Sequence, residues 1–153
     1  MATQGFEFAY MLDGTMGSPV VRDFTLGAAA AHVKGDLMLI QADGFADAVT
    51  GTTTEVTAVM QENIAAADIT AGTTTGKMAI ITRGQVWRCS ADAATTTAVV
   101  GFTKTVDTAD KNTIDADDIT NGAMIYVSPG DALDSDGNVI MDVVFSDTTF
   151  GNA

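Results

Sequence analysis

The chain has little of the chemistry from which catalytic and metal sites are usually built. Its 153 residues include one histidine, His32, and one cysteine, Cys89. With one histidine we expect no His-based metal site and no Ser-His-Asp triad within a single chain, and one cysteine excludes an intramolecular disulfide. We interpret His32 as a partly exposed residue beside an alanine patch, and Cys89 as a buried, inert thiol. The sequence therefore predicts no catalytic residue, no metal site, no cofactor and no enzymatic activity.

Basic residues are also scarce. The chain carries 7 Lys and Arg against 20 Asp and Glu, which gives a formal net charge of −13. Binding to a phosphate backbone needs clustered Lys and Arg, so we expect no nucleic-acid partner. Nearly all of the acids are aspartate, whose short side chain favours turns and caps. This preference predicts a chain of strands and loops.

Long hydrophobic runs are missing as well. No apolar run approaches the length that crosses a bilayer, and residues 1–25 lack the basic start and apolar core of a signal peptide. We therefore expect the chain to be made in a cytoplasm and to have no membrane partner. The hydrophobic fraction is nevertheless 46%, which excludes a disordered chain. A chain of this length forms one domain with a real core.

What the sequence does contain is a series of short apolar segments separated by turn signals. This spacing is typical of all-β folds, and we predict a mainly β protein, a small β-barrel or β-sandwich with little helix. A brief helix is predicted within residues 62–68. The segments assigned to strands are residues 6–10, 37–40, 45–49, 55–64, 78–81, 85–89, 98–106, 124–128 and 139–145.

The last of these segments has one wholly apolar face and one mixed face. The wholly apolar face consists of Val139, Met141, Val143 and Phe145. On the mixed face Ile140 and Val144 flank Asp142, and we predict that these two side chains form a subunit contact in a closed homo-oligomer.

An internal echo links residues 68–84 with residues 118–130. Each copy opens on Asp-Ile-Thr, reaches a Gly followed two positions later by Met, and ends with an apolar run, a hydroxyl residue and Gly. We interpret residues 70–89 as a repeated structural hairpin that turns at Gly84, within a single β-rich domain spanning residues 34–153.

Residues 1–33 are predicted to form an extended N-terminal arm. Aromatic residues alternate over residues 6–10, as in a short strand, and an arm of this kind could add a strand to a partner's sheet edge. The alternative, an edge strand packed on its own domain, stays open. The side chains predicted to bind a partner are Phe6, Phe8, Tyr10, Met11, Val20 and Val21.

Two motifs resemble ligand-binding loops and fall short of them. Residues 72–77 are one residue too short for a phosphate loop and precede a strand instead of a helix. Asp134 and Asp136 match the third and fifth positions of a calcium loop, but Val143 stands at the twelfth, which requires a carboxylate. We interpret this segment as a hairpin loop, with weak calcium binding as the alternative. The acidic run 115–118 is interpreted as a solvated turn.

Several short patterns follow one another over residues 34–106. Lys-Gly-Asp opens a strand, Asp-Gly turns it back, and a Thr-rich loop leads into the next strand. These patterns occupy residues 34–36, 43–44, 57–64, 76–83, 84–87 and 99–102. Their order resembles the head decoration (cement) proteins of tailed bacteriophages. The resemblance covers about half of the chain; residues 1–33 and the second echo after residue 107 depart from it.

The resemblance implies a non-enzymatic structural protein on the outer capsid surface of a virion. Such a protein would bind the major capsid protein, often as a trimer, and stabilise the head against internal DNA pressure. One alternative is another structural subunit of the same particle, such as a tail-tube or fibre protein. A further alternative is a bacterial surface β-domain that binds calcium or glycan.

Overall fold

The computed structural model describes residues 5–50, 55–98, 100, 105–119, 122–128, 132–146 and 148–150. Within these residues the chain forms eleven strands and one 3₁₀ turn, η1 (Ala66–Asp68), inside the predicted brief helix. The strands are β1 (Glu7–Met11), β2 (Val21–Thr25), β3 (Leu37–Ile40), β4 (Ala46–Ala48), β5 (Ala58–Met60), β6 (Thr75–Ile80), β7 (Gln85–Ser90), β8 (Thr105–Asp110), β9 (Thr113–Asp115), β10 (Met124–Tyr126) and β11 (Ile140–Phe145). The predicted mainly β fold is confirmed.

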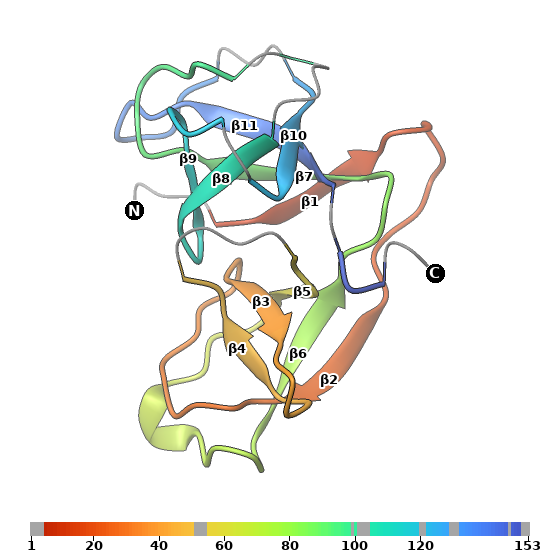
Figure 1. Ribbon diagram of the computed structural model, residues 1–153, viewed down its shortest axis with the longest axis vertical. Helices are drawn as coiled ribbons and strands as arrows, with labels where there is room; N and C mark the ends of the chain where they lie inside the picture. The colour runs from red at the N-terminus through yellow and green to blue at the C-terminus, as the bar shows by residue number, and fades with distance from the viewer. Residues whose placement is uncertain are drawn as a thin grey trace.

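The strands form two antiparallel sheets that lie one above the other (Figure 1). The upper sheet has the order β1-β7-β11-β10-β8-β9, and the lower sheet has the order β2-β6-β5-β3-β4. Neither sheet closes on itself, so the fold is sandwich-like and not a closed barrel. Of the predicted strand 98–106, residues 99 and 101–104 lie outside the described residues, and β8 begins at Thr105.

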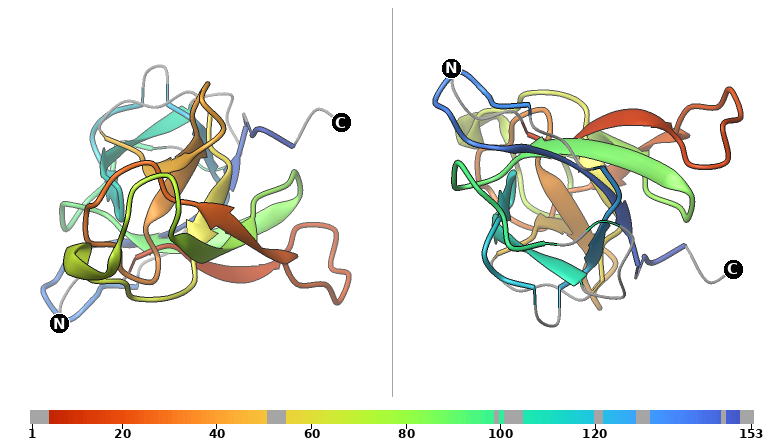
Figure 2. Two further views of the ribbon diagram at one scale, coloured as in Figure 1. Left: turned by 90° about the horizontal axis from the view of Figure 1, so that it is seen from below. Right: turned by 90° about the horizontal axis from the view of Figure 1, so that it is seen from above.

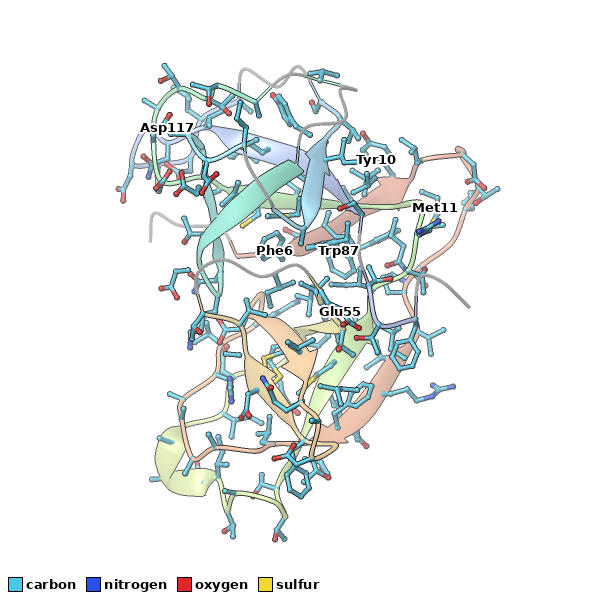
Figure 3. All side chains as sticks on the ribbon, viewed as in Figure 1. Phe6, Tyr10, Met11, Glu55, Trp87 and Asp117 are labelled. Atoms are coloured by element: carbon cyan, nitrogen blue, oxygen red, sulfur yellow. The ribbon has the colours of Figure 1, made fainter. Side chains whose placement is uncertain are left out.

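The main core lies between the two sheets. Alternate residues of several strands point into it, including Trp87 of β7, Leu37 of β3 and Val59 of β5. The predicted apolar face of residues 139–145 is confirmed, since all four of its side chains are buried in this core. Figure 3 shows Trp87 between the sheets, beside Phe6.

A second core lies on the other face of the lower sheet. It consists of Leu26, Met38, Ala46, Ala58, Met60, Ile69 and Met78. Residues 26–33 and 61–74 cover this face, and they are joined to each other by hydrogen bonds such as Leu26 N to Thr74 O at 2.9 Å. A sheet buried on both faces explains why β3 is continuously apolar.

The predicted N-terminal arm is not confirmed. β1 pairs antiparallel with β7 and β2 pairs antiparallel with β6, so each is an edge strand of one sheet. The chain is fixed just before β1, where Phe6 N donates to Gly35 O at 3.0 Å. Gly5 and Gly35 pass so closely that a Cβ on Gly35 would lie 2.9 Å from Gly5 Cα. Both β1 and β2 are thus edge strands packed on the chain's own domain, as the alternative interpretation expected.

The predicted hairpin over residues 70–89 is wrong. β6 and β7 do not pair, because they belong to different sheets. Gly84, with φ +85°, lies in the turn that carries the chain from the lower sheet to the upper one. The echo of β6 is β10, which lies in the upper sheet between β8 and β11. Residues 120–121 and 129–130 of the second copy lie outside the described residues.

Candidate docking surface

Exposed apolar side chains gather where the two sheets share an edge. Of the nine large apolar side chains that are exposed in the described part of the chain, five lie within residues 10–21. We call these five the apolar edge: Tyr10, Leu12, Met16, Val20 and Val21. Met16 is fully exposed and Leu12 is 54% exposed. Single exposed apolar side chains are ordinary, whereas a grouped set marks an interaction surface.

The apolar edge is built from β1, β2 and the loop that joins them. Leu12 N donates to Gly84 O at 2.7 Å, and Val20 O accepts from Ile80 N at 2.9 Å, so both ends of the loop are fixed to the β6–β7 region. Between these anchors the loop projects beyond the body of the molecule, as both views of Figure 2 show.

An Asx turn shapes this loop. Asp13 Oδ1 accepts from Thr15 N at 2.9 Å and from Thr15 Oγ1 at 2.7 Å, and these bonds lower the pKa of Asp13. Gly14 follows with φ +78°, a left-handed conformation that glycine adopts without strain. These local hydrogen bonds therefore fix the loop conformation in which Met16 is exposed to solvent.

An apolar row continues from Tyr10 across the outer face of the upper sheet. Tyr10 lies opposite Val86, Val86 opposite Val144, and Val144 opposite Ile125. Residues opposite one another in a sheet share a face, so these four side chains form one line across four strands. Val86 is buried, whereas Val144 and Ile125 are half-buried.

An ion pair lies beside this row. Arg88 Nε donates to Asp142 Oδ1 at 2.7 Å, and a second guanidinium nitrogen donates to Asp142 Oδ2 at 2.9 Å. This bidentate bond is the main cause of the raised pKa of Arg88. Glu7 lies opposite Arg88 on β1. The outer face of the upper sheet thus carries both an apolar row of side chains and a pair of opposite charges.

The structure separates the eight predicted partner-binding residues into two groups. Phe6 is buried against Phe145, with ring centroids 5.7 Å apart, and Phe8 packs edge-on against Trp87. Phe6 therefore belongs to the core, which corrects its placement as a docking anchor, and the half-buried Phe8 packs against the same core. The other six predicted residues are also exposed or half-buried: Tyr10, Met11, Val20, Val21, Ile140 and Val144.

Two members of the apolar edge, Leu12 and Met16, were not predicted from the sequence. The signal was present in the sequence: each is an apolar residue within a run of turn formers that includes Asp13-Gly14 and Gly17-Ser18-Pro19. Apolar side chains in an exposed turn lie outside the core of their own domain and remain available to a partner.

The opposite end of the upper sheet is acidic. Three loops meet there: Ala116 N donates to Asp92 Oδ1 at 3.0 Å, and Val139 N donates to Ala93 O at 2.8 Å. These loops carry Asp92, Asp115, Asp117, Asp118, Asp134 and Asp136, which we call the acidic end. Figure 3 shows carboxylate oxygens gathered around Asp117, far from Tyr10 and Met11.

Two of these aspartates shape their own loops. Asp115 Oδ1 accepts from the backbone N–H groups of Asp117 and Asp118, which describes the predicted turn. Asp134 Oδ1 accepts from Asp136 N and Asn138 N, both at 2.9 Å. Burial raises the pKa of Asp134, but its hydrogen bonds, chiefly the one from Asn138 N, outweigh burial and lower the pKa. No group of three or more His, Cys, Asp or Glu that could hold a metal ion occurs among the described residues.

Charges balance around the apolar edge, in contrast to the acidic end. The strands β1, β2, β6 and β7, with the β1–β2 and β6–β7 loops, carry four basic residues: Arg22, Lys77, Arg83 and Arg88. The same segments carry the acidic residues Glu7, Asp13 and Asp23, and Asp142 of β11 is bound to Arg88, so the two signs are equal in number. Lys77 Nζ lies 3.3 Å from Asp23 Oδ1. The molecule therefore has one apolar, charge-balanced edge and one strongly acidic end.

The single thiol lies in the main core, as predicted. Cys89 is fully buried, and its Sγ donates to Asn112 O at 3.3 Å. Burial raises the pKa of this thiol well above its ordinary value, so it stays protonated and weakly nucleophilic.

The described residues include no helix with the length and apolar character that a membrane span requires. No protein-family model matches the chain. A search of curated proteins finds no matching sequence.

Proposed function

We propose that this chain is a non-enzymatic virion protein that binds the outer capsid surface of a tailed phage and stabilises the head. The observation that carries the proposal is the division of the surface between the apolar edge and the acidic end. A protein that coats a particle needs one end that docks and one end that faces solvent. The apolar edge suits the first role, and the acidic end suits the second.

The apolar edge has two means of contact with a capsid subunit. Its side chains can be buried, and each fully buried apolar side chain contributes about 1.5–3 kcal/mol. Among the described strands, β1 and β2 also each have one side without a neighbour, where an extended capsid segment can pair. Weak single contacts of this kind gain strength when they repeat over a particle surface.

The acidic end would face outward from the particle. Six aspartates repel nucleic acid and other acidic surfaces, and they keep a densely coated particle soluble. The patterns that resemble decoration proteins lie apart from both surfaces for the most part. They flank β3, lie on β5 and β6 and reach the start of β7, all parts of the framework, while residues 99, 101 and 102 of the last pattern lie outside the described residues.

A homo-oligomer, with a trimer as its proposed size, would use the outer face of the upper sheet. Ile140 and Val144 lie on this face, which also carries the apolar row and the Arg88–Asp142 pair. A contact that combines half-buried apolar side chains with a closed ion pair suits a cyclic assembly.

The test is cosedimentation of the purified protein with undecorated capsids. We expect the wild-type chain to pellet with them. Replacing both Leu12 and Met16 with Ser should weaken binding about 30-fold or more, because about 2 kcal/mol or more of apolar burial is lost. Leu133→Ser is the matched control, since Leu133 is also 54% exposed but lies at the acidic end.

Two results would contradict the proposal. One is a wild-type protein that stays in the supernatant with capsids in every expansion state. The other is assembly of the protein alone into open tubes, which would indicate a tail-tube subunit instead. A melting temperature unchanged by Leu12→Ser and Met16→Ser would show that lost binding is not caused by unfolding.

A further inference from the structure

A buried charged cluster lies where the lower sheet meets the β8–β9 turn. Asp36, just before β3, is fully buried, and Lys111 Nζ lies 3.1 Å from its Oδ2. Lys111 Nζ also donates to Ala31 O at 3.0 Å. His32 is 3% exposed beside this pair, which corrects the interpretation of a partly exposed histidine.

This cluster holds three separate parts of the chain together. His32 N donates to Ile64 O and Ile64 N donates to His32 O, both at 2.9 Å, which joins the two segments covering the second core. Leu37 N donates to Lys111 O at 2.6 Å, which joins β3 to a turn of the upper sheet. We call these contacts of His32, Asp36 and Lys111 the latch.

The ring of His32 has no hydrogen-bond partner within the latch. Its Nδ1 lies 3.8 Å from Asp36 Oδ2, which is too long for a hydrogen bond, and its Nε2 also lacks a partner. Asp36 Oδ2 already accepts from Val33 N at 3.0 Å and contacts Lys111. A neutral ring can remain here, at the cost of its unpaired nitrogens.

An imidazolium would fit this position poorly. The charged groups around the ring are Asp36 before β3, Asp47 on β4 and Lys111 in the β8–β9 turn. A protonated ring would need acceptors for two N–H groups. The nearest carboxylate oxygen, Asp36 Oδ2, is already engaged, and Asp47 Oδ1, although buried without a partner, forms no hydrogen bond with the ring. It would also stand beside the ammonium of Lys111. Burying a charge without bonded partners is costly, so protonation favours a conformation in which the ring is hydrated.

We propose that His32 is the proton sensor of an acid-operated latch, whose protonation releases residues 27–36 from Ile64 and from the β8–β9 turn. Release would uncover the second core and loosen the lower sheet from that turn, while the main core stays packed. This inference goes beyond capsid binding and does not depend on it.

The direction of the pH dependence follows from linkage. Burial lowers the pKa of His32, Lys111 lowers it further, and the carboxylates of Asp36 and Asp47 oppose the shift. A hydrated histidine titrates near pH 6.5, so the open form binds the proton first as pH falls. Between that pH and the lower pKa of the closed form, the population of the open form rises up to about tenfold per pH unit.

The test uses the fact that the chain contains one histidine. NMR of the full-length protein gives the titration of the His32 ring without ambiguity, and amide exchange at His32 and Ile64 reports opening. After correction for intrinsic exchange rates, we expect opening at both amides to increase as pH falls from about 7.5 to about 5, with the slope given by linkage. The core amide of Trp87 serves as the internal control and should not change in parallel.

The matched variant is His32→Phe, which keeps a buried ring and removes the proton site. Its opening should be independent of pH over the same range. If the variant opens with the wild-type pH dependence, or if wild-type His32 titrates at its ordinary pKa while both amides stay closed, the proposal is overturned. Lys111→Met provides a second readout, since removal of the neighbouring cation should raise the pH at which His32 titrates. A downward shift or no shift would also overturn it.

Discussion

The two residues of the ion pair on the outer face of the upper sheet differ strongly in their exposure to solvent. Asp142 is 8% exposed in its side chain, whereas its partner Arg88 is 47% exposed. The carboxylate therefore depends on the guanidinium for its bonds, and the guanidinium depends far less on the carboxylate. Two residues that form one ion pair thus have unequal effects when either is removed.

Arg88→Ala should lower the free energy of unfolding by about 1–3 kcal/mol, because it leaves a buried carboxylate without its donors. The double replacement of Arg88 and Asp142 by Leu should cost less than Arg88→Ala alone. Urea unfolding of both variants and the wild type checks this order. A double variant that is the less stable of the two would mean that the pair itself, and not its broken half, matters to stability.

Alternation along a strand predicted several residue environments correctly. It placed Cys89 in the core and separated Met141 and Val143 from Ile140 and Val144. It could not place Phe6 and Phe8, since a short aromatic alternation indicates a strand without indicating whether its sheet is covered. The burial of His32 was hidden for a similar reason: its neighbours in space are Ile64 and Lys111, which are distant in sequence.

Strands and their turns were predicted more completely than their pairing. Apolar runs located β3, β6, β7 and β11, because periodicity is a local property of the sequence. The choice of partner strand is a long-range property. The turn at Gly84 could close a hairpin or pass between sheets with the same residues, and the structure shows the second outcome.

Within β6, one glycine has a packing role that a turn interpretation does not predict. A Cβ on Gly76 would lie 2.8 Å from Met60 Cε, inside the second core. Because Met60 Cε is the flexible end of its side chain and can move, we expect Gly76→Ala to destabilise the protein by only about 1 kcal/mol through overpacking. Gly17→Ala is the control, because the added Cβ would meet Met11 only at an ordinary 3.4 Å. Thermal unfolding of both variants tests the difference, and equal melting temperatures would contradict it.

Over the whole molecule, charge is distributed unevenly in a way that net charge alone does not reveal. The sequence predicted an acidic protein with −13 charges. It did not predict that three loops distant in sequence would bring six aspartates to one end, because the hydrogen bonds joining them exist only in the folded chain. The candidate docking surface was likewise half predicted, from Tyr10, Val20 and Val21 without Leu12 and Met16.

Repulsion within the acidic end should make stability depend on salt. Raising ionic strength from about 10 mM to about 150 mM shortens the Debye length from about 30 Å to about 8 Å, so we expect the melting temperature to rise. Asp117 and Asp136 are both exposed. Replacing both with Lys should reduce this rise, whereas Asp13→Lys at the apolar edge should reduce it less. An equal salt response in all three proteins would exclude local repulsion as the cause.

Two of the places where the described chain passes between the sheets, residues 12–20 and 82–84, are hydrogen-bonded to each other through Leu12 and Gly84. Covalent backbone therefore joins the sheets on the same side as the apolar edge (Figure 1). This arrangement has a mechanical consequence. A pulling force applied at the apolar edge enters the backbone of both sheets at once, so it loads their hydrogen-bonded strands together. Tension from a moving partner surface would not act first on the weaker side-chain packing between the layers.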